Sequence, residues 1–144
     1  MSERYSIAPQ MRDYDQLGVQ WVPYTMFAAS ADYRSASVNT DRYGLRCSDL
    51  SGGGSIDTIQ EGVGCSLIVG SSTAFGVGAT DDTETIASKL STMTERIFLN
   101  FGCRAFNSRQ ELFLFLTHAM KLKNIGEVVL VSGVNNLYVS AFNE

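Results

Sequence analysis

The sequence of 144 residues is poor in charge, in cysteine and in long apolar runs. Charged residues make up only 18% of it, against 44% hydrophobic residues, which excludes a disordered polyelectrolyte and predicts one buried core. The 11 basic and 15 acidic residues give a formal charge of −4. Because nucleic-acid binders normally carry a basic patch, we expect no nucleic-acid partner.

No segment has the apolar length that membrane insertion requires. Met1–Tyr5 is followed by mixed polar sequence, unlike the apolar run of a signal peptide. No window approaches the roughly 18 apolar residues of a membrane-spanning helix. We therefore expect a cytoplasmic protein without a membrane partner.

Metal and cofactor motifs are also missing. Cys47, Cys65 and Cys103 are far apart and form no Cys/His cluster, so we expect buried or half-buried thiols rather than a disulfide framework or a zinc site. The glycine-rich stretch 70–78 lacks both the P-loop ending and the dinucleotide-binding spacing. The acidic residues over 81–84 suit the first turn of a helix. We expect no cofactor and no metal.

The first part of the chain, residues 1–64, is expected to be an N-terminal arm or small β layer. It contains turn formers, a glycine-rich tract over 51–55 and short alternating stretches that predict edge strands over 20–27, 37–40 and 43–46. Its aromatic residues could stack on sugar rings, but packing of the arm on the core is the favoured interpretation. These residues are Trp21, Tyr24, Phe27 and Tyr33.

Residues 65–144 show the alternating pattern of an α/β domain. Strands are predicted over 66–70, 96–100 and 127–132, and helices over about 81–92 and from Asn107 or Ser108 to about 123. Right-handed crossovers would make a flavodoxin-like parallel sheet in the order 2-1-3 with helices on both faces, in three layers. This sheet is incomplete, and no clear helix follows its third strand.

The third predicted strand, residues 127–132, is apolar and lacks a covering element. Its continuous apolar run is typical of a strand covered on both faces, yet the predicted elements supply nothing to cover it. An exposed apolar edge is a liability. We expect self-association, or a second chain, to cover residues 127–132.

Small and polar residues follow each predicted strand. The three segments are Gly70-Ser71-Ser72-Thr73-Ala74-Phe75-Gly76, Asn100-Phe101-Gly102 and Gly133-Val134-Asn135-Asn136. Since ligands collect outside the carboxyl ends of parallel strands, these segments predict a binding or catalytic site.

Together the three segments resemble the conserved blocks of the SGNH (GDSL-type) hydrolases. The resemblance implies that Ser72 is a nucleophile and that its own N–H, the N–H of Gly102 and the side-chain amide of Asn135 form an oxyanion hole. It implies a small ester or an acylated carbohydrate as substrate. Ser71 and Asn136 stand where the family has aspartates, and we assign both, with Arg104, to substrate binding.

The family's Asp-x-x-His base is missing. The only histidine, His118, lies in the second predicted helix, away from the strand ends. We expect the chain to be part of a longer hydrolase whose base follows Glu144, or to receive the base from a second chain. The alternative is a non-catalytic module on the same scaffold that binds a carbohydrate or acyl ligand or serves in assembly.

Overall fold

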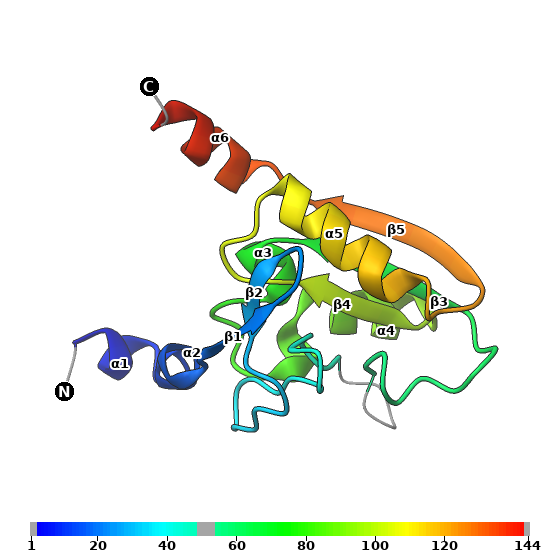
Figure 1. Ribbon diagram of the computed structural model, residues 1–144. Coiled ribbons are helices and arrows are strands. Elements are labelled where there is room, and N and C mark those ends of the chain that lie inside the picture. Colours follow the sequence, from blue (N-terminus) through cyan, green and yellow to red (C-terminus); the bar gives the residue numbers. More distant parts are fainter. Residues whose placement is uncertain (1–2, 49–53, 143–144) are drawn as a thin grey trace.

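The protein has a mixed α/β fold, as the sequence predicts (Figure 1). The computed structural model describes residues 3–48 and 54–142, so most of the 51–55 tract lies outside the described residues. The elements in chain order are α1 (Glu3–Ile7), α2 (Met11–Gln16), β1 (Val19–Val22), β2 (Met26–Ala29), β3 (Cys65–Gly70), α3 (Ser72–Phe75), the 3-10 turn η1 (Asp82–Glu84), α4 (Ile86–Thr94), β4 (Phe98–Gly102), α5 (Ser108–Ala119), β5 (Ile125–Val131) and α6 (Val134–Ala141).

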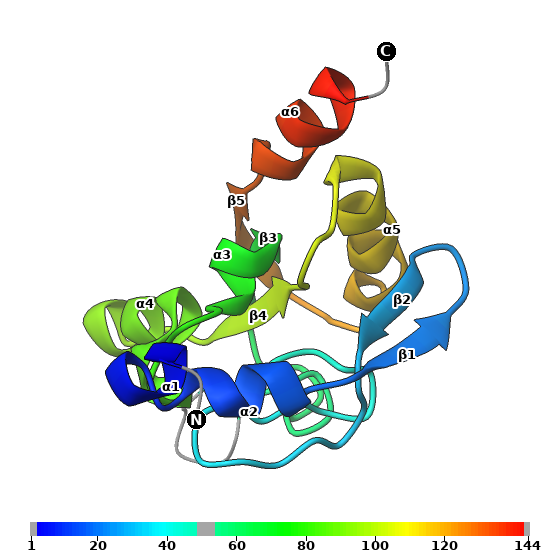
Figure 2. The same ribbon diagram turned by 90° about the vertical axis from the view of Figure 1, so that its left-hand side faces the viewer.

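The main sheet is parallel, with β3 between β4 and β5. All six residues of β3 are buried, as expected for a central strand covered on both faces. Helix α5 packs on one face, and α3 and α4 pack on the other, which gives three layers (Figure 2). No described helix is both long enough and apolar enough to span a bilayer.

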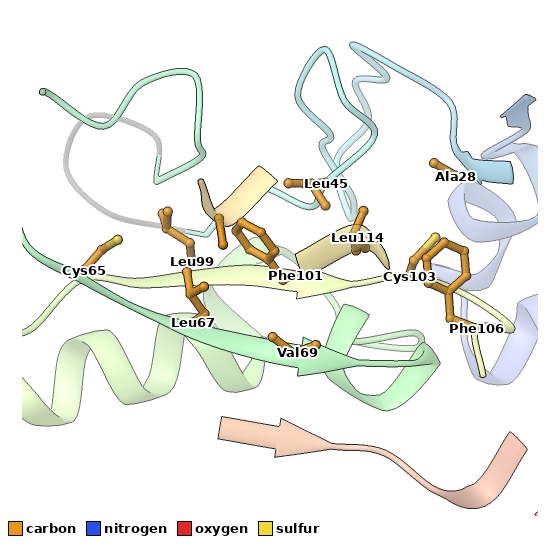
Figure 3. Close-up of a cluster of buried hydrophobic side chains, with 11 residues drawn as sticks. Ala28, Leu45, Cys65, Leu67, Val69, Leu99, Phe101, Cys103, Phe106 and Leu114 are labelled. Carbon is orange, nitrogen blue, oxygen red and sulfur yellow. The ribbon is translucent and has the colours of Figure 1, made fainter. Parts of the chain in front are cut away.

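The larger core cluster joins the sheet to α5 and to the arm (Figure 3). Leu67 and Phe101 of the sheet pack with Leu114 of α5, and Ala28 and Leu45 of the arm belong to the same cluster. A smaller cluster on the opposite face contains Ile68, Ala74, Ala87 and Phe98. The arm therefore shares its hydrophobic core with the sheet.

The cysteines form no disulfide. Cys65 and Cys103 are buried and Cys47 is half-buried, all as free thiols, as the sequence predicts. Burial raises the pKa of Cys103 to about 11, so that thiol stays protonated at neutral pH.

Helix α5 begins where the sequence predicts. The Asn107 side chain accepts hydrogen bonds from the N–H groups of Arg109 and Gln110, and the Gln110 side chain accepts one from the Asn107 N–H. This capping box satisfies N–H groups that have no partner within the helix.

Several predictions about the arm are wrong. Strands β1 and β2 form an antiparallel hairpin over residues 19–29, which overlaps the predicted range 20–27, but residues 37–46 contain only the isolated bridge between Thr40 and Arg46. That region is shaped by side-chain bonds to the backbone instead. Helices α1 and α2 were not expected. Each is shorter than two helical turns, and a shorter segment shows no recognisable repeat of apolar residues.

The end of the chain also differs from the prediction. Residues Val134–Ala141 form helix α6, although no clear helix was expected after the third strand, and none of its residues is buried. In Figure 1 this helix extends away from the sheet. Strand β5 is left uncovered, as expected from the lack of a predicted covering element: none of its residues is buried, and Leu130 is 70% exposed. Its only paired neighbour among the described strands is β3.

One buried arginine connects the arm to the loop after β3. Arg46 is 0% exposed. Its Nε donates to Asp82 Oδ1 at 2.9 Å, and its Nη1 donates to the Tyr14 hydroxyl at 2.6 Å and to the Gly76 carbonyl at 2.7 Å. Nη2 donates to the Ser37 carbonyl at 2.6 Å. Three of these partners lie at least 30 positions from Arg46 in the sequence, and Ser37 lies nine positions from it.

Asp41 organises the turn that precedes Arg46. Its Oδ1 accepts hydrogen bonds from the N–H groups of Tyr43 and Leu45, both at 2.9 Å. Its Oδ2 is buried and has no hydrogen-bond partner. Burial outweighs the two backbone bonds and raises the pKa of this carboxyl group to about 6.

We expect Arg46→Met to destabilise the protein by about 3–5 kcal/mol, because it leaves the partly buried Asp82 carboxylate without its counter-ion. Urea unfolding followed by circular dichroism measures this loss. Arg109→Met makes the same change on an exposed helix position and serves as the control. A loss for Arg46→Met that matches the control would contradict the assigned role.

The Asp41 carboxyl group should make stability depend on pH. Its pKa is raised from 3.8 to about 6 on folding, so the folded state holds the proton more tightly. Its contribution to the free energy of unfolding therefore falls by roughly 3 kcal/mol as the pH rises from about 4 to about 6.

The difference in unfolding free energy between wild type and Asp41→Asn, measured from pH 3 to pH 8, isolates this effect. The variant Glu95→Gln, at an exposed carboxyl group that does not act on Asp41, is the control. A difference that stays flat over this range would show that Asp41 does not titrate as described.

Candidate functional site

The three strand-end segments lie at one edge of the sheet. The register aligns Gly70 of β3 with Gly102 of β4 and with Val131 of β5. Helix α3 begins two residues after Gly70, and α6 begins three residues after Val131. Figure 2 shows α3, the end of β4 and the start of α6 at the same edge. The topology thus brings the predicted segments to one side of the molecule.

Ser72 is the first residue of α3 and is half-buried. Its hydroxyl forms no hydrogen bond with the described residues, and its N–H has no backbone partner among them. The first N–H groups of a helix have no acceptor within the helix, which leaves this amide available. The preceding Ser71 is 7% exposed and forms no side-chain cap.

Gly102 lies directly against the backbone of α3. A Cβ atom added to it would lie 2.2 Å from the Phe75 nitrogen and 2.6 Å from the Ala74 carbonyl carbon, so no side chain fits at this position. The Gly102 N–H donates to Asn100 Oδ1 at 2.9 Å. Asn100 Nδ2 donates in turn to the Ala74 carbonyl at 2.9 Å.

Asn100 is therefore a residue of the site to which sequence reasoning assigned no role. It is 2% exposed and joins the end of β4 to α3 through both ends of its amide. A signal was present, because a polar residue within an otherwise buried apolar strand must find hydrogen-bond partners.

Asn135 and Asn136 attach α6 to the loop and helix that follow β4. Asn135 Nδ2 donates to the Phe106 carbonyl at 2.7 Å. Asn136 Oδ1 accepts from the Ser108 N–H, the first of α5, at 2.9 Å. Both asparagines thus have structural partners in this conformation.

Arg104 is hydrogen-bonded to the arm, so its donors are not directed into an open pocket. Its Nη1 donates to the Tyr14 carbonyl at 2.8 Å, and its Nη2 donates to the Leu17 carbonyl and, at 3.1 Å, to the Gly18 carbonyl. These carbonyls lie at the carboxyl end of α2, where helix carbonyls lack intrahelical partners and a cation is favourable. Arg104 therefore caps α2.

His118 lies far from the strand-end segments. Helix α5 runs antiparallel to the strands, so its first residues lie at the carboxyl edge and His118, in its last turn, lies near the opposite edge. The ring contacts Tyr43, with 4.7 Å between centroids. Burial and the nearby Lys121 ammonium lower the pKa of His118 to about 4, so the ring is neutral at pH 7.

The site therefore contains an unbonded hydroxyl and amide at Ser72. Two further donors from the strand-end segments, Gly102 N–H and Asn135 Nδ2, already have partners. The described residues place no general base beside Ser72. A serine hydroxyl at neutral pH is a weak nucleophile without one. What the described residues provide by themselves is an unbonded hydroxyl and an unpaired amide at the carboxyl edge of the sheet.

We expect Gly102→Ala to destabilise the protein by about 1–3 kcal/mol, because α3 must move to admit the new methyl group. Gly64→Ala is the matched control, since its added methyl would meet the nearest atom at 3.5 Å, an ordinary contact. Thermal unfolding of both variants compares the two positions. Equal melting temperatures would contradict the close contact between β4 and α3.

Comparisons with protein-family models and with curated proteins find no match for this chain.

Proposed function

We propose that the protein is a serine ester hydrolase of the SGNH type, with Ser72 as its nucleophile. The observation that carries this proposal is the unbonded Ser72 hydroxyl at the carboxyl end of the central strand β3. In open α/β sheets this is the position where ligands bind. We also infer that the sheet is the core of a flavodoxin-like domain with strand order 2-1-3.

The oxyanion hole would use three donors. The Ser72 N–H lacks a backbone partner among the described residues, whereas Gly102 N–H and Asn135 Nδ2 would exchange their bonds to Asn100 and Phe106 for bonds to the substrate oxygen. Each such donor is worth about 10²–10³-fold in rate when it is aimed at the developing charge. We propose that Ser71, Arg104 and Asn136 support substrate binding, for which Arg104 and Asn136 would have to release their present bonds to the arm and to Ser108.

The reaction needs a base that the described residues do not supply at Ser72. The base takes the hydroxyl proton as Ser72 Oγ bonds to the ester carbon, and the same proton passes to the departing alcohol. Water then cleaves the acyl-serine bond and releases the carboxylic acid. Small esters and acylated carbohydrates are the proposed substrates.

We expect the missing base to be carried by a protein segment that binds to the exposed side of β5 and α6. Val128 and Leu130 of β5 and Leu137 of α6 are exposed, and this side adjoins the end of β3. We propose that a further protein segment or a second chain covers residues 127–132 and brings the base with it.

A second candidate function is a binding module without turnover. It is favoured by the bonds that Gly102 and Asn135 already make, and by the position of His118 at the other end of α5. In this case the same edge of the sheet would bind an acyl or carbohydrate ligand without attack on it.

A fluorophosphonate probe distinguishes the two functions. In the protein expressed from its intact gene in its own host, we expect labelling at Ser72 and hydrolysis of 4-nitrophenyl acetate. Ser72→Ala should abolish the labelling and lower the hydrolysis rate by at least about 10³-fold, because removal of a catalytic serine leaves only binding contributions.

Thr73→Ala is the control, since it makes a similar change one residue further along α3 at an exposed position. It should keep labelling and hydrolysis within about twofold of wild type. Circular dichroism confirms that each variant is folded. A folded wild-type protein that is neither labelled nor active would overturn the hydrolase proposal and support the binding module.

A further inference from the structure

A second pocket lies between the β1–β2 hairpin, α5 and the turn at residues 42–43. Its volume is about 270 Å³. Its apolar walls are formed by Val22, Pro23, Tyr24, Ala28, Tyr43 and Leu114. It shares no lining residue with the strand-end segments, so it is a separate site. The volume lies just below the range of about 300–1,000 Å³ found for typical ligand pockets, which indicates a small ligand.

Thr25 lines this pocket and carries an unpaired hydroxyl, whose oxygen atom is itself buried. The residue is 3% exposed, and its Oγ1 has no hydrogen-bond partner. Its carbonyl accepts a bond from Gln110 Nε2 at 2.9 Å, which ties the hairpin to α5. Because a buried hydroxyl without a partner costs free energy, this atom is suited to bind a polar group of a ligand.

His118 provides a second polar group in the same pocket. Its Nδ1 lies 3.4 Å from Lys121 Nζ. An ammonium group can only donate, so Nδ1 accepts and Nε2 of the neutral ring carries the proton. The ring can therefore donate one hydrogen bond to an oxygen atom.

Charge near the pocket selects against a cationic ligand. The Lys121 ammonium lies 4.0 Å from the centroid of the Tyr43 ring, which forms part of the wall. Arg42 also lines the pocket, and its charge is paired with Asp57. Since an unpaired negative group is missing from the lining, nothing there would neutralise a bound cation.

Aromatic side chains lie at the rim. Tyr24 stacks against Phe113 of α5, with 6.1 Å between ring centroids. Tyr24 lines the pocket and is 75% exposed, whereas Trp21 is 79% exposed and does not line it. The sequence favoured packing of both on the core, which the structure shows for Phe27 and Tyr33 instead. A flat ring that enters the pocket would thus meet apolar surface at the rim and within it.

We propose that this pocket binds a small uncharged molecule with an apolar ring and one hydroxyl group. The ring would lie against Leu114 and Tyr43. The ligand's hydroxyl oxygen would accept from His118 Nε2, and its hydrogen would be donated to Thr25 Oγ1 after the Thr25 side chain turns toward the ligand. This site does not depend on the proposed hydrolase activity.

Two probes of equal shape test the proposal: 4-methylphenol, and 4-methyltoluene, which has a methyl group in place of the hydroxyl. Calorimetric titration of the purified protein should show saturable binding of 4-methylphenol. Thr25→Val keeps the side-chain shape but removes the hydroxyl, and should weaken 4-methylphenol binding by about 2- to 12-fold. It should leave the affinity for 4-methyltoluene within about twofold.

Thr117→Val is the matched control. Thr117 lines the same pocket, but its hydroxyl already donates to the Phe113 carbonyl at 2.7 Å. This variant should bind both probes as the wild type does. Ala28→Phe fills the pocket and should abolish binding of both probes, with folding checked by circular dichroism.

Three results would overturn the proposal. One is the absence of saturable 4-methylphenol binding to the wild-type protein. Another is an equal effect of Thr25→Val and Thr117→Val. The third is unchanged binding in a folded Ala28→Phe variant, which would place the probe elsewhere.

Discussion

A guanidinium group cannot be buried at low cost unless its donors find acceptors and its charge finds a counter-ion. Arg46 meets this requirement only when α2, the segment at Ser37, the end of α3 and η1 come together around it. The interaction therefore holds the arm on the α/β layer. It also holds the loop that follows Ser72, so the geometry of the candidate site depends on an arginine more than twenty residues away in the sequence.

The carboxyl edge of the sheet is constructed from close backbone contacts. Gly102 touches the backbone of α3 without room for a side chain, and Asn100 bonds to both. This rigidity suits a site that must aim hydrogen-bond donors at one point. It also keeps Gly102 and Asn135 paired in the present conformation, so catalysis would require a local rearrangement as well as a base.

Prediction from sequence succeeded where local chemistry is sufficient. Buried apolar runs identified the three strands of the main sheet, and Asn107 with Gln110 marked the start of α5. It failed over residues 37–46, where hydrogen bonds made by Asp41 and Arg46 replace the expected strands. It also failed at α6, none of whose residues is buried, so the helix gives no pattern of a buried face.

The sequence by itself determined the α/β class, the main secondary-structure elements and the place of three polar segments at strand ends, because these depend on periodicity and local capping. Only the tertiary structure decided what the polar side chains do. Arg104 caps α2, Asn100 supports Gly102, and His118 lines a pocket away from Ser72. The physical reason is that a hydrogen-bond partner or a pocket is chosen by distance in space, which the order of residues along the chain does not contain.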